Sequence, residues 1–133
     1  IFRIAELEKQ CFRDPWNFRM LAAAFFSENT LTVSAEEEGA LVGYAFAVLA
    51  GEEADVANVA VAESCRRRGI ASALLSALEE GARARGVRDL FLEVRVSNAP
   101  AMALYLRRGY CGAYARKRYY GDGEDALVMR KKL

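Results

Sequence analysis

The chain has 133 residues, of which 53% are hydrophobic and 28% charged, a balance typical of one globular domain that can bury a core. The formal net charge is only +1, so no overall field attracts the protein to nucleic acid or to an anionic membrane. Histidine is absent, which excludes Ser-His-Asp and Cys-His catalysis as well as histidine metal sites. Acid–base chemistry is therefore left to carboxylates, tyrosine, lysine or cysteine.

Other features indicate where the protein works. The longest strongly apolar stretch, LVGYAFAVLAG, is too short to cross a bilayer, and no signal-peptide pattern precedes it. Cys11, Cys65 and Cys111 are odd in number and far apart, which favours reduced thiols over a disulfide framework or a zinc site. We therefore expect a cytoplasmic protein with no membrane, direct nucleic-acid or metal partner. The sequence leaves the oligomeric state open and is compatible with a monomer.

The predicted elements begin with two helices. Ile4, Leu7 and Cys11 share one helical face, and Asp14-Pro15 is a typical start for a second helix that carries apolar residues through Phe25. Three β-prone segments follow at residues 30–35, 40–50 and 54–61, separated by short polar turns rich in glutamate. These segments predict three consecutive antiparallel strands.

The second half of the chain alternates between helix and strand. Residues 69–85 have apolar residues at helical spacing and precede Gly86, a residue typical of helix C-terminal caps. A buried strand is predicted over residues 89–94, and a short helix runs from about Asn98 to residues 107–109. Strands over 110–118 and 126–131 close the chain. The order αα, βββ, α, β, α, ββ predicts one α/β domain over residues 1–133, with a mixed sheet and helices on both faces.

The segment CRRRGIAS, residues 65–72, joins a predicted strand to a long helix. A helix N-terminus offers unpaired N–H groups and partial positive charge, and Gly69 and Ala71 lack bulk that would hold an anion away from the backbone. Three interpretations are open: a solvated turn, a nucleic-acid patch, or a cradle for a pyrophosphate. The patterns GxxxxGK[ST] and GxGxxG are absent, which disfavours an ATPase or a Rossmann enzyme.

Several motifs together favour the cradle. Arg66-x-x-Gly69-x-Ala71 resembles the Q/R-x-x-G-x-G/A acetyl-CoA signature of the GNAT superfamily of N-acetyltransferases, although six residues alone meet that pattern by chance. NVAV at residues 58–61 resembles the family's bulged strand, which splays from its neighbour. The segments LEVRVSN, ALYLRRGY, FRDPW and RKRYYGDGEDALVM resemble the RimI-type N-alpha-acetyltransferases, which modify a ribosomal protein. The resemblance covers nearly the whole chain.

The resemblance implies a mostly antiparallel GNAT sheet with splayed central strands. Two departures affect the substrate side more than the cofactor side. The family's first strand and its lead-in are missing, and the loop after Tyr120 is shorter than in the family pattern. Because the chain begins at Ile1, within a helical pattern, we expect it to be N-terminally truncated.

The resemblance also implies acetyl-CoA as the co-substrate. The backbone of Val59, Ala60 and Val61 is expected to pair with the pantetheine as an added strand, and these residues can serve as core at the same time. The pyrophosphate is assigned to residues 67–72. Asn98 is assigned to a contact near the departing sulfur, with a helix N-cap as its alternative role. The expected cofactor contacts are Val59, Ala60, Val61, Arg66, Arg67, Arg68, Gly69, Ile70, Ala71, Ser72 and Asn98.

Glu93 interrupts an apolar strand, and strand alternation places it on the face opposite Leu92 and Val94. An ion pair with Arg95 or another arginine is one role for it. The other is catalytic, because acyl transfer to an amine needs a proton acceptor and the chain has no histidine. An α-amine with a pKa of ~8 is roughly one-tenth neutral at pH 7, whereas a lysine near ~10.4 is less than ~0.1% neutral. A lone glutamate, acting directly or through water, therefore suits an N-terminal amine better than lysine.

Tyr105 is the expected partner of Glu93 near the cofactor sulfur. A tyrosine with a pKa of ~10 is a weaker acid than a thiol near ~8.5, so we expect a hydrogen bond to the developing thiolate, with proton transfer late or shared. The alternative role for Tyr105 is an amphipathic core residue of a short helix.

The substrate-side candidates are aromatic. Tyr119 and Tyr120 lie in an acidic loop that suits a peptide N-terminus with basic side chains, although such a loop is also often only solvated. Trp16 either helps to shape the groove for that peptide or packs in the core. Arg116 and Arg118 allow a contact with the ribosome surface.

Three classes of function follow. The favoured one is an acetyl-CoA-dependent N-alpha-acetyltransferase that acts on a protein N-terminus, of the N-terminal alanine type of a ribosomal protein, by direct attack of the amine on the thioester. Within the same superfamily the alternative acceptor is a small amine, such as an antibiotic or polyamine, or a lysine side chain. A non-catalytic CoA-binding module is disfavoured by the intact Glu93 and Tyr105. An RNA-binding domain is disfavoured by the near-neutral charge and the absence of an RNP-like motif.

Overall fold

The computed structural model describes residues 2–11, 18–66 and 69–133. Two helices, α1 (Phe2–Cys11) and α2 (Phe18–Phe25), are followed by the strands β1 (Thr30–Glu37), β2 (Ala40–Ala50) and β3 (Glu53–Val61). A short 3-10 helix (Glu63–Cys65) precedes α3 (Ile70–Ala84). The chain continues with β4 (Asp89–Arg95), α4 (Ala99–Arg107), β5 (Cys111–Arg116) and β6 (Ala126–Lys132). The predicted order of helices and strands is confirmed.

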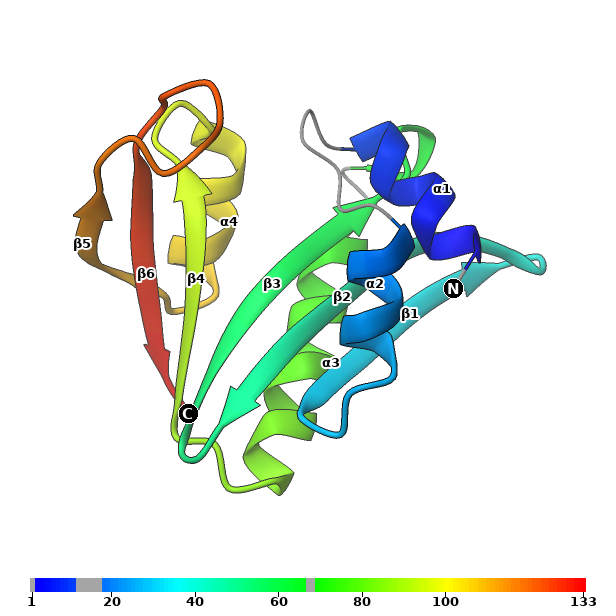
Figure 1. Ribbon diagram of the computed structural model, residues 1–133, viewed down its shortest axis with the longest axis horizontal. Coiled ribbons are helices and arrows are strands. Elements are labelled where there is room, and N and C mark those ends of the chain that lie inside the picture. Colours follow the sequence, from blue (N-terminus) through cyan, green and yellow to red (C-terminus); the bar gives the residue numbers. More distant parts are fainter. Residues whose placement is uncertain (1, 12–17, 67–68) are drawn as a thin grey trace.

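The strands form one six-stranded sheet in the order β1-β2-β3-β4-β6-β5. Neighbouring strands are antiparallel except for β3 and β4, which are parallel. The helices α1 and α2 lie on one face of the sheet, and α3 and α4 lie on the other (Figure 1). This architecture confirms the predicted mixed, mostly antiparallel sheet with helices on both faces.

The parallel strands β3 and β4 pair only where both begin. Their register joins residues 53–56 of β3 to residues 89–92 of β4 and ends there. Beyond this point the two strands diverge like the arms of a V (Figure 1). Residues 57–61 of β3 and 93–95 of β4 therefore do not pair across the gap. Strand edges of this kind expose backbone N–H and C=O groups to which an extended chain can add.

A β-bulge in β3 coincides with the start of the divergence. The register of β2 with β3 joins Phe46 to Asn58 but Ala47 to Val56, so Ala57 is an extra residue in β3. A bulge of one residue increases the local twist and bends the strand away from its neighbour. The bulged and splayed strand expected at residues 58–61 is confirmed.

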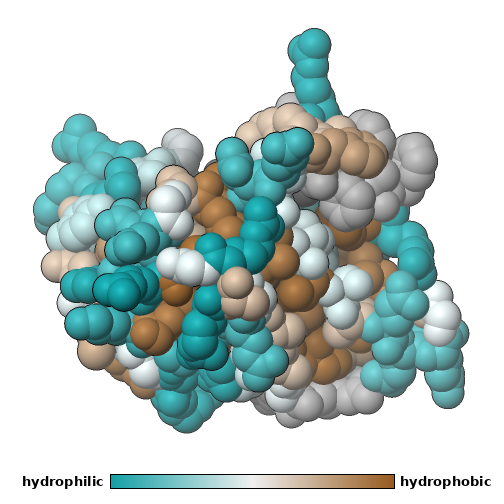
Figure 2. All heavy atoms as spheres, turned by 90° about the horizontal axis from the view of Figure 1, so that it is seen from below, coloured by the Kyte–Doolittle hydropathy of each residue, from teal (hydrophilic) through white to brown (hydrophobic). Residues whose placement is uncertain are grey.

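Two cores hold the sheet. The larger core lies between the sheet and α3, where Leu74, Leu75, Leu78 and Ala82 are buried at the predicted helical spacing. The smaller core lies under α1 and contains Ile4, Leu7, Tyr44, Phe46 and Ala60. Seen from below, hydrophobic atoms appear in the middle of the surface between hydrophilic residues along its sides (Figure 2). Among the helices that the structure describes, none combines the length and hydrophobicity that crossing a membrane requires.

The predicted strand over residues 110–118 is wrong at both ends. Tyr110 is only 1% exposed, and its N–H donates to the carbonyl of Tyr105 at 2.9 Å, so it belongs to the turn that ends α4. Arg118 has a φ of 52°, which interrupts extended backbone, and its N–H donates to the Asp125 carboxylate at 2.9 Å. All residues of β5 are exposed, as expected of an edge strand that little burial holds in place.

The other predicted strand and helix bounds agree with the structure to within two residues. Gly86, with a φ of 85°, follows the end of α3 as predicted. Asn98 caps α4, since its side chain accepts from the N–H of Ala101 at 3.2 Å. The expected start of the second helix at Asp14-Pro15 lies outside the described residues.

Candidate active site

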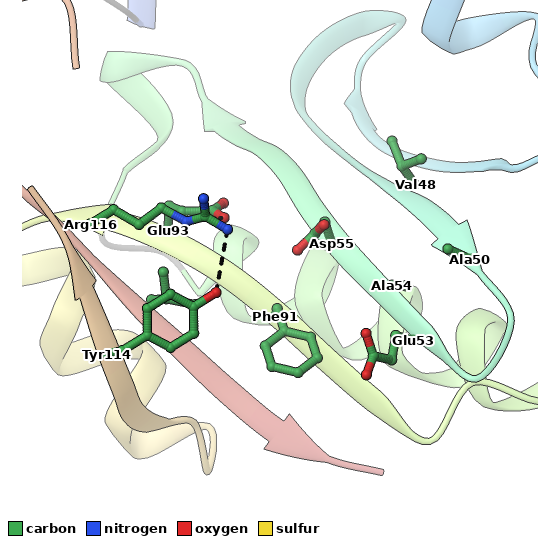
Figure 3. Close-up of a pocket in the computed structure, with 10 residues that line it drawn as sticks. Val48, Ala50, Glu53, Ala54, Asp55, Phe91, Glu93, Tyr114 and Arg116 are labelled. Carbon is green, nitrogen blue, oxygen red and sulfur yellow. Dashed lines mark hydrogen bonds and ion pairs between the residues drawn. The ribbon is translucent and has the colours of Figure 1, made fainter. Parts of the chain in front are cut away.

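A cavity lies on the sheet face that carries α1 and α2. Its strand residues alternate with buried core residues such as Ala47 and Leu92, which point to α3. Figure 3 shows carboxylates and aromatic rings from β3, β4 and β5 around this cavity. The lining residues are Val48, Ala50, Glu53, Ala54, Asp55, Phe91, Glu93, Tyr114, Arg116 and Val128.

Glu93 lines this cavity from the point where β4 separates from β3. Its side chain is 18% exposed and lies on the face opposite the buried Leu92 and Val94, which confirms the alternation predicted for the strand. Burial raises the pKa of the Glu93 carboxyl, and the nearby Asp55 charge raises it further, while Arg116 opposes the shift. A carboxylate with a raised pKa is a better proton acceptor, so this environment suits a general base.

The ion pair considered for Glu93 and Arg95 does not form. Arg95 instead contacts Asp122 at 2.8 Å and Glu124 at 3.0 Å. Glu93 instead pairs with another arginine, Arg116, whose Nε lies 3.9 Å from the carboxylate. At that distance the pair is weak, which leaves the Glu93 oxygens accessible to a proton donor in the cavity.

Asp55 is a feature of the site that the sequence interpretation missed. It lies opposite Phe91 in the β3–β4 register, and its charge acts on Glu93 across the closed end of the V. The alternation that identified Glu93 also applies to Asp55, because Ala54 and Val56 on either side of it are buried. What alternation cannot indicate is that the two strands are neighbours.

Tyr105 lies on α4, on the other side of β4 from the Glu93 side chain. Its ring packs against the larger core and makes an edge contact with Tyr110, with ring centroids 5.9 Å apart. Burial raises the pKa of Tyr105 to about 12. Compared with a thiol near ~8.5, full proton donation by this tyrosine is uphill by roughly 5 kcal/mol. Tyr105 is therefore suited to donating a hydrogen bond rather than to transferring a proton early.

Replacing Tyr105 with phenylalanine should lower turnover by about tenfold to a hundredfold, the usual effect of losing a hydrogen bond to a charged group. The deficit should vary little between pH 6 and about 9.5, because the pKa of Tyr105 near 12 lies above that range. Steady-state rates with acetyl-CoA, measured for the parent and for Tyr105→Phe across that pH range, give the size of the deficit. Tyr110→Phe is the control, because it removes a hydroxyl from the same ring pair that donates to Glu79 instead. Equal deficits for both variants would assign Tyr105 to the core alone.

The N-terminus of α3 is positioned beside the end of β3. Gly69 has a φ of 79°, a left-handed conformation that favours glycine, and it directly precedes the first helical residue, Ile70. A Cβ placed on Gly69 would meet no atom within 4 Å, so the backbone here is open to a ligand. Ala71 and Ser72 follow in the first turn, where unpaired N–H groups and the helix dipole favour a bound anion.

The remaining cofactor candidates are the arginines of the loop, the last three residues of β3, and Asn98. The Nε of Arg66 donates to the carbonyl of Val61 at 3.0 Å, so this arginine braces the loop against the end of β3. Arg67 and Arg68 lie outside the described residues. Val59, Ala60 and Val61 form the unpaired edge of the gap while their side chains pack in the two cores. The exposed Asn98 is an N-cap, as its alternative role required.

The acids of the loop after Tyr120 pair with cations of the protein itself. Asp122 and Glu124 pair with Arg95, and Asp125 contacts Lys117 at 3.4 Å. These acids therefore fold the loop onto neighbouring cations, and hydrogen bonds from Ser97 and Arg95 lower the pKa of Glu124. The cavity instead draws its negative charge from β3 and β4.

Arg95 packs on Tyr120, which forms an aromatic pair with Tyr119 at the start of this loop. Its guanidinium lies 4.0 Å from the centre of the Tyr120 ring, and Tyr119 meets Tyr120 edge to face with centroids 5.1 Å apart. Burial raises the pKa of Tyr120 to about 12, with Arg95 opposing the shift and the charges of Tyr119, Glu93 and Tyr105 adding to it. Trp16 lies outside the described residues.

In the part of the chain that the structure describes, no three Cys, Asp or Glu side chains gather as a metal site would require. The site offers an unpaired strand edge, an open helix N-terminus, a shielded carboxylate and a half-buried phenol. Together they suit the transfer of an acyl group from an extended phosphate-bearing carrier to an amine.

Comparison with known proteins agrees with this chemistry. Residues 1–110 match the model of the acetyltransferase (GNAT) family. The chain is 36% identical over 126 residues to the [ribosomal protein bS18]-alanine N-acetyltransferase of Escherichia coli K12, covering 92% of this chain and 84% of that relative. An uncharacterized N-acetyltransferase of Methanocaldococcus jannaschii is 33% identical over 130 residues, which cover 97% of this chain and 83% of that protein.

A solved structure is similar over nearly the whole chain. The crystal structure of the ribosomal-protein-S18-alanine N-acetyltransferase from Escherichia coli superimposes with a TM-score of 0.91 at 34% identity, covering 98% of this chain and 85% of that one. The fold and the site define an acyltransferase of the N-acetyltransferase class. The chain belongs to the acetyltransferase (GNAT) family.

Proposed function

We propose that this N-acetyltransferase transfers an acetyl group from acetyl-CoA to the N-terminal α-amine of a ribosomal protein, with alanine as the first residue. The observation that carries the proposal is the shielded Glu93 carboxylate, which lies in a cavity on the α1 face where β3 and β4 separate. The named relative in Escherichia coli, an alanine N-acetyltransferase of a ribosomal protein, supports the acceptor class.

Acetyl-CoA supplies a thioester whose acyl carbon accepts the amine nitrogen. The residues that suit its binding are Val59, Ala60 and Val61 for the pantetheine, because their strand edge does not pair with β4, and the loop at Gly69 for the pyrophosphate. Both features lie at the same end of the V, because β3 leads through the 3-10 helix directly into α3. Members of the family use this co-substrate, and the pattern Arg66-x-x-Gly69-x-Ala71 stands at the corresponding junction.

The acceptor amine enters from the α1 face, where the cavity opens. Glu93, directly or through one water, takes the proton that the ammonium group must lose before its nitrogen can attack. The new C–N bond forms as the C–S bond breaks, and the electron pair leaves with the sulfur. The second proton, which the nitrogen loses as it becomes an amide, passes through Tyr105 or water to the thiolate. Tyr105, on the other side of β4, stabilises the sulfur by a hydrogen bond. The base and the hydroxyl thus act from opposite faces of the sheet.

Peptides with a free N-terminal alanine should be acetylated faster than N-blocked peptides that contain lysine. The physical reason is that an α-amine is roughly one-tenth neutral at pH 7, whereas less than ~0.1% of lysine is neutral, so one carboxylate suffices only for the first. Release of thiol from acetyl-CoA, measured with matched peptides and with polyamines, tests this. A faster rate with lysine or with a polyamine would assign the enzyme to one of those acceptors instead.

A further inference from the structure

A buried carboxylate on α1 takes no part in the chemistry above. Glu8 is only 1% exposed and shares the inward face of α1 with Ile4, Leu7 and Cys11. Burying a carboxylate costs free energy unless hydrogen bonds compensate it, and an apolar residue of similar size is often no less stable. A carboxyl group in this core therefore calls for a role beyond packing.

Glu8 binds two strands through one oxygen. The hydroxyl of Tyr44 on β2 donates to Oε1 of Glu8, and Nδ2 of Asn58 on β3 donates to the same oxygen at 2.7 Å. Burial, and next the hydrogen bond to Glu8, raise the pKa of Tyr44, so its hydroxyl remains a donor at physiological pH. Glu8 thus ties α1 to two neighbouring strands of the sheet.

The hydrogen bond from Asn58 to Glu8 lies directly after the bulge in β3. Asn58 follows the extra residue Ala57 and pairs with Phe46. Before the bulge, the side chains of Ala54 and Val56 point to the α3 core. After the bulge, the side chains of Val59 and Val61 point to that core instead. The bulge therefore inverts the alternation of β3.

Without the bulge, a one-residue slip would turn Asn58 toward the apolar α3 core and carry the following residues to the opposite faces. The backbone groups that face the β4 gap would change as well, because N–H and C=O groups alternate in direction along a strand. Glu8 stabilises only the bulged register, since only that register presents the Asn58 amide to α1.

A second contact from α1 reaches Val61, the last residue of β3. Sγ of Cys11, one turn after Glu8, lies 3.4 Å from the carbonyl of Val61, which also accepts from Nε of Arg66 at 3.0 Å. One face of α1 therefore contacts residues 58 and 61, near the two ends of the unpaired edge.

We propose that Glu8 is a positioning residue for the cofactor: by holding Asn58 on the α1 face, it selects the bulged register of β3 and so sets the backbone edge to which the pantetheine pairs. The role rests on the proposed function, because it assumes that acetyl-CoA adds to this edge. Glu8 does not touch the reacting atoms and acts through Asn58.

Two single substitutions test the role, because each removes one donor from the same Glu8 oxygen. Asn58→Ala removes the tie to the bulge, and Tyr44→Phe removes the tie to β2 and serves as the matched control. Both should lower the midpoint of thermal unfolding. Only Asn58→Ala should raise the Kd of acetyl-CoA, by tenfold or more in calorimetry, whereas Tyr44→Phe should stay within about twofold of the parent. Equal shifts in Kd for the two variants would show that the network is only structural.

Variants at Glu8 itself separate affinity from stability. Glu8→Gln keeps an acceptor oxygen for Asn58 and should bind acetyl-CoA within about threefold of the parent. The triple substitution Glu8→Leu, Tyr44→Phe and Asn58→Val replaces all three polar groups by apolar ones, so its thermal stability should approach that of the parent while the Kd stays at least tenfold higher. Parental affinity in a stable triple variant would overturn the proposal.

A measurement without cofactor separates this inference from the proposed function. Amide hydrogen exchange of residues 57–61 in the cofactor-free protein should be faster in Asn58→Ala than in Tyr44→Phe, because the bulge loses its anchor. Unchanged exchange in Asn58→Ala would overturn the role of Glu8 whether or not acetyl-CoA binds. If the parent protein failed to bind acetyl-CoA, the proposed cofactor site itself would be wrong.

Discussion

Glu93→Gln should lower turnover by roughly a hundredfold or more at pH 7, in the range that removal of a general base costs. The amide keeps the shape and the hydrogen bonding of the side chain but cannot accept a proton, so the Kd of acetyl-CoA should barely change. Asp89→Asn is the matched control, because Asp89 lies on the same face of β4 with a similar exposed fraction, 20% against 18%, and pairs with Arg130 outside the cavity. Its turnover should stay close to that of the parent.

The pH dependence of this deficit gives an independent check. In the parent, Glu93 must be ionised to act, so kcat/KM should rise with pH through a pKa above the ordinary value for glutamate, because burial and Asp55 disfavour the charged form. In Glu93→Gln, kcat/KM should no longer rise with pH through that pKa. Its deficit should also shrink toward pH 8 and above, as more of the α-amine becomes neutral without help. Near-parental turnover of Glu93→Gln at pH 7 would make Glu93 structural and direct the search to a water held by the splayed strand.

Gly69→Glu should raise the Kd of acetyl-CoA at least tenfold, which corresponds to about 1.4 kcal/mol. A side chain at a φ of 79° is strained, and its carboxylate would repel a pyrophosphate at the helix N-terminus. The Cβ itself adds no clash, since it meets no atom within 4 Å. Calorimetry on the folded variant measures the effect.

Gly86→Glu is a close control for this change. Gly86 lies just after the other end of α3 with a φ of 85°, and a Cβ there also meets no atom within 4 Å. Both variants should lose a similar stability, about 1 kcal/mol from the left-handed conformation. Only Gly69→Glu should weaken acetyl-CoA binding. Unchanged affinity in Gly69→Glu, or an equal loss in Gly86→Glu, would remove the pyrophosphate site from this loop.

Much of the fold follows from local patterns in the chain. The apolar spacing of Leu74, Leu75 and Leu78 determined both the helix and its buried face, because a helix repeats every 3.6 residues whatever it packs on. The alternation around Glu93 likewise determined which face of the strand carries the carboxylate. A composition without histidine limited the base to a few residue types, and the motif around Gly69 indicated the family.

The tertiary structure decided which of these faces meet. Asp55 acts on Glu93 only because β3 and β4 are neighbours, and the acids after Tyr120 pair with Arg95 rather than line the cavity. A charged residue at position 8, within the apolar stripe of α1, was a visible irregularity in the sequence. Its meaning depends on Asn58, fifty residues away, and on a bulge that inverts the alternation of β3. Periodicity along the chain sets the face on which a side chain lies, whereas its partner depends on strand order and register, which arise only when distant segments pack together.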